Sequence, residues 1–301
     1  MPFIAWHPIF NFPLPEGHRF PMLKYELLHD QLLYEDVVKE NAYFTPEMPE
    51  EKHLSAVHQE SYIKRLLTLR LSRQEIRRIG FPLSQQLVER ELLIVQGTIT
   101  AAVTALQNKI GFNIAGGTHH AGSNWGEGFC LLNDQAVAAR YLLDYQNIRQ
   151  VLIIDLDVHQ GNGTAEIFQH EKRVFTFSMH GRNNFPFHKE KSDLDIGLED
   201  DTAGDKYLDL LEKNLDLLFK KVHPDFVFFQ AGADVLKSDK MGKLKLTKED
   251  CKVRDKIVFN YCKQHDLSVQ VSMGGGYSAA LKDIVDAHCN TYKEGISALL
   301  D

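Results

Sequence analysis

Cysteine is scarce in this chain, with four residues among 301. Cys130, Cys251, Cys262 and Cys289 form no C-x-x-C pair. A chain of this length does not need disulfides to stabilise its core. We therefore expect reduced thiols and a cytoplasmic location.

Long apolar runs and basic tracts are also lacking. No apolar segment reaches the ~18 residues of a membrane-spanning helix. The N-terminal MPFIAWHPIF has neither the charged nor the long apolar region of a signal peptide, so we expect neither membrane anchor nor leader. Lys and Arg number 34 against 41 Asp and Glu, giving a net charge of −7. Without a basic tract, direct nucleic-acid binding is not expected.

The chain does contain short apolar segments that alternate with segments of helical periodicity. Runs rich in Val, Ile and Phe predict strands at 111–117, 149–157, 173–180, 225–234 and 267–276. Helical spacing occurs at 24–40, 55–72, 84–107, 133–146, 203–222 and 247–265. This order favours an α/β fold with a parallel sheet covered on both faces. Five prolines in the first 21 residues predict an irregular N-terminal segment, and one domain is expected over residues 1–301.

Polar residues gather where these strands end. The five strands end, in chain order, in GGTHH, DLDVH, SMH, GAD and GGGY. Open parallel sheets bind ligands outside the carboxyl ends of their strands. Packing alone does not explain this collection of histidines, aspartates and glycines, so we expect a functional site at that edge.

Asp157, His159 and Asp234 have the chemistry of a metal site. Residues two apart in an extended segment project to the same side, so Asp157 and His159 can reach one point. With Asp234 they offer three protein ligands, a number that leaves a position open for catalysis. Zinc suits these ligands, and Fe(II), Co(II) or Mn(II) also fits. In the alternative reading, Asp157 caps a turn and His159 is merely hydrogen-bonded.

The tandem histidines His119 and His120 form a second group. Neighbouring side chains point in different directions, so each histidine needs its own partner, and Asp155 and Asn162 are the candidates. One imidazole could then act as a general base. Tyr277, after three glycines, could donate to a developing oxyanion. The alternatives are a pair of surface histidines and a phosphate-binding glycine loop, although no GK[ST] or G-x-G-x-x-G follows a strand.

GGTHHAG, GFCLLND, DLDVHQGNGT, FSMH, QAGADVL and GGGYS resemble, in this order, the motifs of the histone deacetylase family. The resemblance extends over roughly residues 5–290. HRFPMLKY, HQGNG and VLKSDKMGKLKLT are most similar to the class IV branch, which includes many bacterial members. The resemblance implies a three-layer α/β/α fold around a mostly parallel eight-stranded sheet.

The same resemblance implies a role for each matching residue. Asp157, His159 and Asp234 match the zinc ligands, with Fe²⁺ as the other candidate metal. His120 matches the general base and acid, His119 its electrostatic partner, Asp155 the carboxylate that orients His119, and Tyr277 the hydroxyl that polarises the scissile carbonyl. Gly128 and Phe129 match one wall of the acyl-lysine tunnel. A structural K⁺ site is implied at Asp155, Asp157, His159, Ser178 and Met179.

Two positions depart from the family pattern. Asn162 stands where class I members have an aspartate, so His120 lacks a charged partner. The usual Phe/Tyr-Pro-Gly of the second tunnel wall is replaced by NNFPFHKEKSDLD. Either Phe185 or Phe187 can supply the aromatic wall, so pocket width and acyl-chain preference stay open.

The resulting hypothesis is metal-assisted hydrolysis of acyl-lysine in proteins or peptides. A metal can bring the pKa of water near ~7, so no covalent nucleophile is needed, and Cys130 is interpreted as a packed thiol. Three rival functions are a two-metal ureohydrolase of the arginase type, a non-catalytic acyl-lysine binding protein, and a deacylase of acetylpolyamines or other acylated amines. GADVL offers only Asp234 where the first type carries two aspartates. Oligomeric state is not predicted.

Overall fold

An eight-stranded parallel sheet forms the centre of the computed structural model, which describes residues 3–300. The strand order is β2-β1-β3-β8-β7-β4-β5-β6, and each neighbouring pair is parallel. The strands are β1 (Phe3–Ala5), β2 (Tyr43–Phe44), β3 (Ile110–Asn113), β4 (Val151–Asp155), β5 (Val174–Gly181), β6 (Leu194–Leu198), β7 (Phe226–Gln230) and β8 (Ser268–Ser272). The expected parallel α/β architecture is confirmed.

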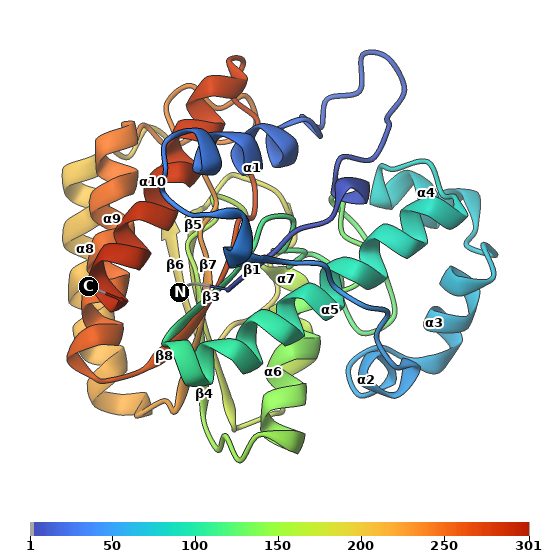
Figure 1. Cartoon of the computed structure of the whole chain (residues 1–301), viewed down its shortest axis with the longest axis horizontal. Helices are drawn as coiled ribbons and strands as arrows, with labels where there is room; N and C mark the ends of the chain where they lie inside the picture. Colours follow the sequence, from blue (N-terminus) through green and yellow to red (C-terminus); the bar gives the residue numbers. More distant parts are fainter. Residues whose placement is uncertain (1–2, 301) are drawn as a thin grey trace.

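Helices cover both faces of this sheet, giving three layers (Figure 1). One layer contains α8 (Gly204–Val222), α9 (Lys248–Gln264) and α10 (Leu281–Leu299), with α1 (Lys24–Tyr34) packed on α10. The other contains α5 (Gln85–Asn108), α6 (Asp134–Tyr145) and α7 (Asn162–Phe168). Three short helices extend beyond α5 and lie to its right in Figure 1: α2 (Glu51–Ser55), α3 (Glu60–Leu67) and α4 (Arg73–Ile79).

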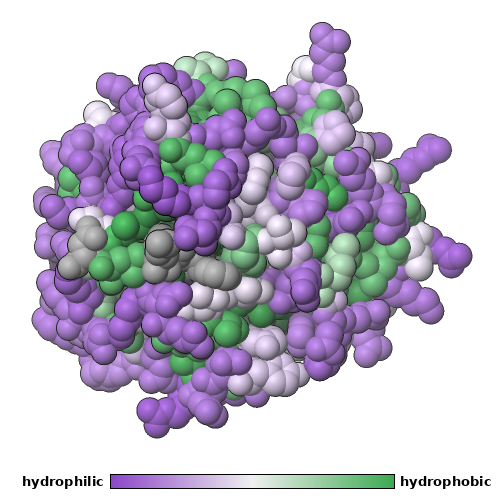
Figure 2. Space-filling model, viewed as in Figure 1, coloured by the Kyte–Doolittle hydropathy of each residue, from purple (hydrophilic) through white to green (hydrophobic). Residues whose placement is uncertain are grey.

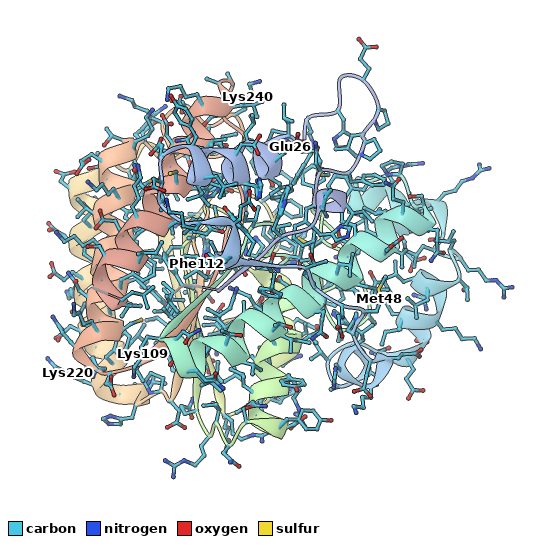
Figure 3. The ribbon with its side chains drawn as sticks, viewed as in Figure 1. Glu26, Met48, Lys109, Phe112, Lys220 and Lys240 are labelled. Carbon is cyan, nitrogen blue, oxygen red and sulfur yellow. The ribbon has the colours of Figure 1, made fainter. Side chains whose placement is uncertain are left out.

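The central strands are apolar because both of their faces are covered. Every residue of β4 and β7 is buried, which explains why these two strands show no polar alternation; β8 alternates Ser and Gln with Val, although all five of its residues are buried. Phe112 of β3, labelled near the centre of Figure 3, stacks on Tyr292 of α10 with ring centroids 4.1 Å apart. Aromatic stacking of this kind joins the helical layer to the sheet.

Both ends of α4 are fixed by local interactions. Ser72 accepts a hydrogen bond from the Glu75 amide, and Glu75 accepts one from the Ser72 amide, forming a capping box. Gly80 ends the helix at φ +88°, a left-handed conformation that suits glycine. The arginines of this helix are therefore held on a defined support beside the candidate site.

Several predicted boundaries were wrong. The N-terminal segment, expected to be irregular, contains β1, whereas the strand predicted over 173–180 agrees with β5 to within one residue at each end. The helix predicted over 55–72 is limited to α3: before it, the His58 ring bonds Gly122 and Asn133, and after it, Leu69 adopts φ +57°. The helix predicted over 24–40 ends at Tyr34, just before Asp36 adopts φ +57°. The prediction also missed β6, α7 and α10.

The surface facing the viewer in Figure 2 is mainly hydrophilic, with apolar side chains in small groups between polar ones. Among residues 3–300, no helix combines the length and the hydropathy that crossing a membrane requires.

Candidate active site

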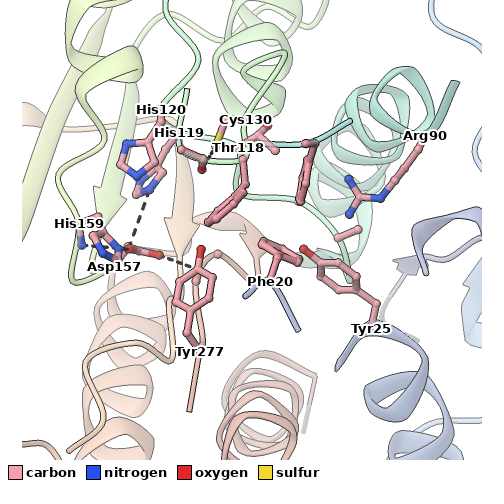
Figure 4. Close-up of a pocket in the computed structure, with 18 residues that line it drawn as sticks. Phe20, Tyr25, Arg90, Thr118, His119, His120, Cys130, Asp157, His159 and Tyr277 are labelled. Carbon is pink, nitrogen blue, oxygen red and sulfur yellow. Dashed lines mark hydrogen bonds and ion pairs between the residues drawn. The ribbon is translucent and has the colours of Figure 1, made fainter. Parts of the chain in front are cut away.

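The polar segments identified in the sequence meet at the carboxyl edge of the sheet. Four of the five follow β3, β8, β7 and β4, which are consecutive in the strand order, and the fifth, SMH, is part of β5 beside β4. Figure 4 shows His119, His120, Asp157, His159 and Tyr277 directed toward one cavity. The parallel arrangement therefore brings together residues up to about 160 positions apart in the chain, as expected for a sheet of this kind.

Asp157, His159 and Asp234 form the candidate metal centre. One ligand atom from each lies within 4.8 Å of the others, and all three residues are buried. His159 Nδ1 lies 3.1 Å from Asp157 Oδ1 and 3.0 Å from Asp234 Oδ2. The prediction that these three side chains meet is therefore confirmed in the described structure.

Backbone amides orient the two carboxylates. Gly275 N donates to Asp157 Oδ2 at 2.7 Å, and Val158 N donates to Asp234 Oδ1 at 2.9 Å. Each carboxylate thus keeps its other oxygen turned toward His159. Gly275 is required here because a Cβ at this position would lie 1.9 Å from Asp234 Oδ2.

The donor set fits a divalent cation. Burial and the nearby Asp157 carboxylate raise the pKa of Asp234 to about 7. Burial lowers the pKa of His159, but hydrogen bonds to Asp157 and Asp234 outweigh it and raise that pKa to about 10. Two buried carboxylates converging on one ring nitrogen need positive charge between them. One imidazole and two carboxylates can hold zinc or Fe(II) there and leave a coordination position open.

His119 is paired with Asp155. His119 Nδ1 lies 2.7 Å from Asp155 Oδ2, and both side chains are buried. Burial lowers the pKa of His119, but the Asp155 carboxylate outweighs this effect and raises the pKa to about 9. The ring centroid of His119 lies 4.2 Å from that of His120.

His120 has a neutral partner, as the sequence suggested. Its Nδ1 lies 2.7 Å from Asn162 Oδ1. Burial lowers the pKa of His120 well below 6.5, and the nearby His119 and His159 charges lower it further. A neutral imidazole at pH 7 can accept a proton, which is the property that a general base requires.

Glu127 completes this arrangement, and sequence reasoning missed it. Its Oε1 accepts a hydrogen bond from Asn162 Nδ2 at 2.5 Å, while Oε2 accepts one from Arg78 Nε at 2.5 Å. A carboxylate can only accept, so the Asn162 NH₂ group faces Glu127 and the amide oxygen faces His120. His120 therefore donates from Nδ1 and keeps Nε2 as the acceptor. In the sequence, the only indication of this role was that GEGFC contains one acidic residue, Glu127.

Tyr277 points its hydroxyl toward the candidate metal centre (Figure 4). Its ring lies 6.2 Å from the His159 ring, centroid to centroid. Burial raises the pKa of Tyr277 well above 10, with the Asp234 and Asp157 charges adding to the effect, so the hydroxyl keeps its proton. Asp239, which the sequence analysis did not identify, accepts a hydrogen bond from the Tyr277 amide at 2.6 Å.

Two cavities lead to this centre. The inner cavity is about 40 Å³ and the outer one about 500 Å³, and both are lined by His120, Gly128, Phe129, His159 and Tyr277. Gly128 has φ +56°, and a Cβ there would lie 2.7 Å from the His120 ring. Glycine thus allows the chain to pass close to His120.

The structure distinguishes the two phenylalanines of the second wall. Phe185 is half-buried, and its ring centroid lies 5.0 Å from that of His120 at 84°. Phe187 is 86% exposed at the outer cavity. Phe185 therefore forms the part of the outer cavity wall that adjoins the His120 ring and Gly128, and Phe187 lies at the mouth.

Two buried cations beside the inner cavity were also missed. Lys24 donates to the Gly274 carbonyl at 3.1 Å, and burial lowers its pKa to about 8. Arg90 lines the cavity and donates to the Phe10 carbonyl. Lys24 lies on α1 and Arg90 on α5, two helices whose other buried residues are mostly apolar. Cys130 lines the same cavity, where burial raises its thiol pKa well above 9, consistent with a packed thiol.

Comparison with known proteins agrees with this geometry. Residues 18–292 match the histone deacetylase domain. An uncharacterized protein of Picosynechococcus sp. is 42% identical over 285 residues, which cover 95% of each chain. Histone deacetylase 2 of Arabidopsis thaliana is 28% identical, and the match covers 93% of this chain and 75% of the relative. Human histone deacetylase 1 is 27% identical, and the match covers 95% of this chain and 62% of the relative.

Solved structures share the fold. A crystal structure of an HDAC homolog from Aquifex aeolicus superposes with a TM-score of 0.83 at 22% identity, covering 100% of this chain and 88% of that one. An HDAC homolog complexed with SAHA gives 0.82 at 21% identity with the same coverage. The eight-stranded α/β/α architecture is therefore common to these proteins.

Proposed function

The chain belongs to the histone deacetylase family, and from that premise we propose that it hydrolyses the amide bond of acyl-lysine side chains in proteins or peptides. One observation carries the proposal: a buried Asp157–His159–Asp234 centre lies in the same cavity as a neutral histidine and a protonated tyrosine. A binding protein needs a pocket, but it does not need an acid–base group beside a metal centre.

Each polar group has a distinct task in this proposal. A divalent cation held by Asp157, His159 and Asp234 would polarise both the attacking water and the acyl carbonyl. His120 accepts the proton of the water at Nε2 and returns it to the leaving amine. Tyr277 donates to the carbonyl oxygen as negative charge develops on it.

The remaining residues hold these groups in place. Asp155 orients His119, and the His119 charge keeps the pKa of His120 low. Gly128, Phe129 and Phe185 form the walls that take the acyl-lysine stem. A K⁺ ion bound near Asp155, Asp157, His159, Ser178 and Met179 stays a prediction; its support here is that Asp155 and Ser178 are paired on β4 and β5.

The alternative substrates are acetylpolyamines and other small acylated amines. The test is an activity screen over acetyl-lysine peptides, longer acyl-lysine peptides and acetylpolyamines, with the protein loaded with Zn²⁺ or Fe²⁺. We expect hydrolysis of acyl-lysine peptides that stops when the metal is removed by chelation. Turnover of acetylpolyamines alone would contradict the proposal, and peptide binding without hydrolysis at full metal occupancy would indicate a non-catalytic binding protein.

A further inference from the structure

The outer cavity has an unusual charge. Its lining includes four exposed cations from three separate segments and no carboxylate: Arg19, Arg77, Arg78 and Lys243. Arg19 precedes α1, the two other arginines lie on α4, and Lys243 follows β7. This concentration occurs in a chain whose net charge is −7, so it does not reflect the average composition.

Two of these four cations have a carboxylate partner, and two have none among the described residues. Arg78 pairs with Glu127, and Lys243 Nζ lies 3.6 Å from Asp200. Within residues 3–300, neither Arg19 nor Arg77 lies within 4 Å of a carboxylate oxygen. The mouth of the tunnel therefore keeps a positive excess.

The position of Arg19 links this charge to the tunnel. Its guanidinium lies over the Phe129 ring, 5.1 Å from the ring centroid. Phe129 lines both the inner and the outer cavity. A group that enters the tunnel along Phe129 thus passes beside an exposed positive charge.

We propose that this mouth selects acidic substrates, namely polypeptides in which Asp or Glu flanks the acyl-lysine. The inference rests on the proposed hydrolysis of acyl-lysine and narrows its substrate class. A cleft lined by one sign of charge raises the local concentration and the association rate of ligands of opposite sign. Polycationic acylated amines meet repulsion at the same mouth.

The size of the outer cavity also suits a peptide better than a small acidic molecule. The outer cavity, at about 500 Å³, is far larger than the inner one of about 40 Å³. It therefore holds more than the stem of a single acyl-lysine. Phe187, which is 86% exposed at this mouth, offers an aromatic surface to side chains on either side of the acyl-lysine.

The test uses the metal-loaded full chain and three acetyl-lysine peptides of equal length, with Asp, Ser or Lys flanking the acetyl-lysine. We expect kcat/KM to fall in the order Asp, Ser, Lys, with roughly tenfold between the first and last at low ionic strength. The difference should reside mainly in KM. It should shrink as NaCl is raised, because salt screens exposed charges.

Charge reversal provides the matched variants. Arg77→Glu and Arg19→Glu break no ion pair in the described structure, so each should weaken or reverse the preference for the Asp peptide over the Ser peptide. Lys263→Glu is the control: Lys263 is exposed and lies near the end of α9, just before β8 begins, and so at the opposite edge of the sheet from the mouth. Like the two arginines, it has no carboxylate oxygen within 4 Å among the described residues.

The outcomes separate the two proposals. Equal kcat/KM for the three peptides, or preference for Lys flanks, with the Ser peptide hydrolysed normally, would contradict the acidic-substrate inference alone. If no peptide of any charge is hydrolysed at full metal occupancy, the proposed function itself is wrong. An Asp preference that survives both charge reversals would show that other residues cause it.

Discussion

The carboxylate of Glu127 accepts a hydrogen bond of 2.5 Å from the side-chain amide of Asn162. This contact determines which end of the amide faces His120, and hence which ring nitrogen of His120 can accept a proton. The Glu127 carboxylate thus contacts Asn162, which stands between it and His120. Arg78 neutralises that charge at the rim of the outer cavity.

Glu127→Gln should lower kcat roughly tenfold with little change in KM or metal content. The glutamine can donate or accept, so it no longer dictates the orientation of the Asn162 amide, and part of the His120 population takes the other tautomer. Steady-state kinetics with metal analysis, together with ¹⁵N NMR of the His120 ring, checks this. Glu199→Gln, on an exposed carboxylate, is the matched control. Unchanged kcat and an unchanged tautomer would contradict the proposed positioning.

The double variant Asn162→Asp with Glu127→Gln should move the acidic limb of the kcat/KM profile to higher pH. Asn162→Asp alone would place two carboxylates about 2.5 Å apart, so the second substitution removes the competing charge. A carboxylate beside His120 favours the imidazolium and raises its pKa by ~1–3 units. Because the base must be neutral, activity is then lost at a higher pH as the solution is acidified. An unmoved limb at full metal occupancy would show that His120 is not the base.

Tyr277→Phe should reduce kcat by ~10²–10³ while KM and metal content change little. A donor aimed at a developing oxyanion acts mainly in the transition state. The pKa of Tyr277 lies well above 10, so the wild-type hydroxyl is a donor at every pH where the protein is assayed. Near-normal turnover would mean that the hydroxyl serves another purpose.

Asp234→Asn should abolish activity and strongly reduce bound metal while leaving the fold intact. The amide oxygen can still accept the hydrogen bond from Val158, so the backbone keeps its partner. The variant cannot supply the second negative charge of the candidate metal centre. Metal analysis and circular dichroism measure the two effects separately. Metal content equal to that of the wild type would exclude Asp234 as a ligand.

Phe185→Ala should change acyl-chain preference, whereas Phe187→Ala should not. The Phe185 ring contacts the His120 ring, while Phe187 is 86% exposed. Removing the aromatic wall beside His120 widens the tunnel, so longer acyl-lysines should gain in kcat/KM relative to acetyl-lysine. A panel of acyl-lysine peptides of increasing chain length checks this. An effect confined to Phe187→Ala would assign the wall to the other residue.

The parallel sheet and the meeting of Asp157, His159 and Asp234 could both be predicted from the sequence. Apolar strands without polar alternation predict burial on both faces of the sheet, and every residue of β4 and β7 is buried. Asp157 and His159 share one side because of the period of an extended chain, and the parallel arrangement delivers Asp234 to the same edge. These features depend on short-range geometry and on one general rule of sheet topology.

Other contacts around the candidate centre could not be predicted from the sequence. Glu127 meets Asn162 across 35 positions of the chain, and Arg19, Arg77 and Lys243 meet around one mouth from three loops and helices. The tertiary structure also separated Phe185 from Phe187, which have identical chemistry two residues apart. Residue type and periodicity describe each segment alone, whereas these contacts depend on where loops pack after the sheet has formed, because loop positions follow from long-range packing rather than local propensity.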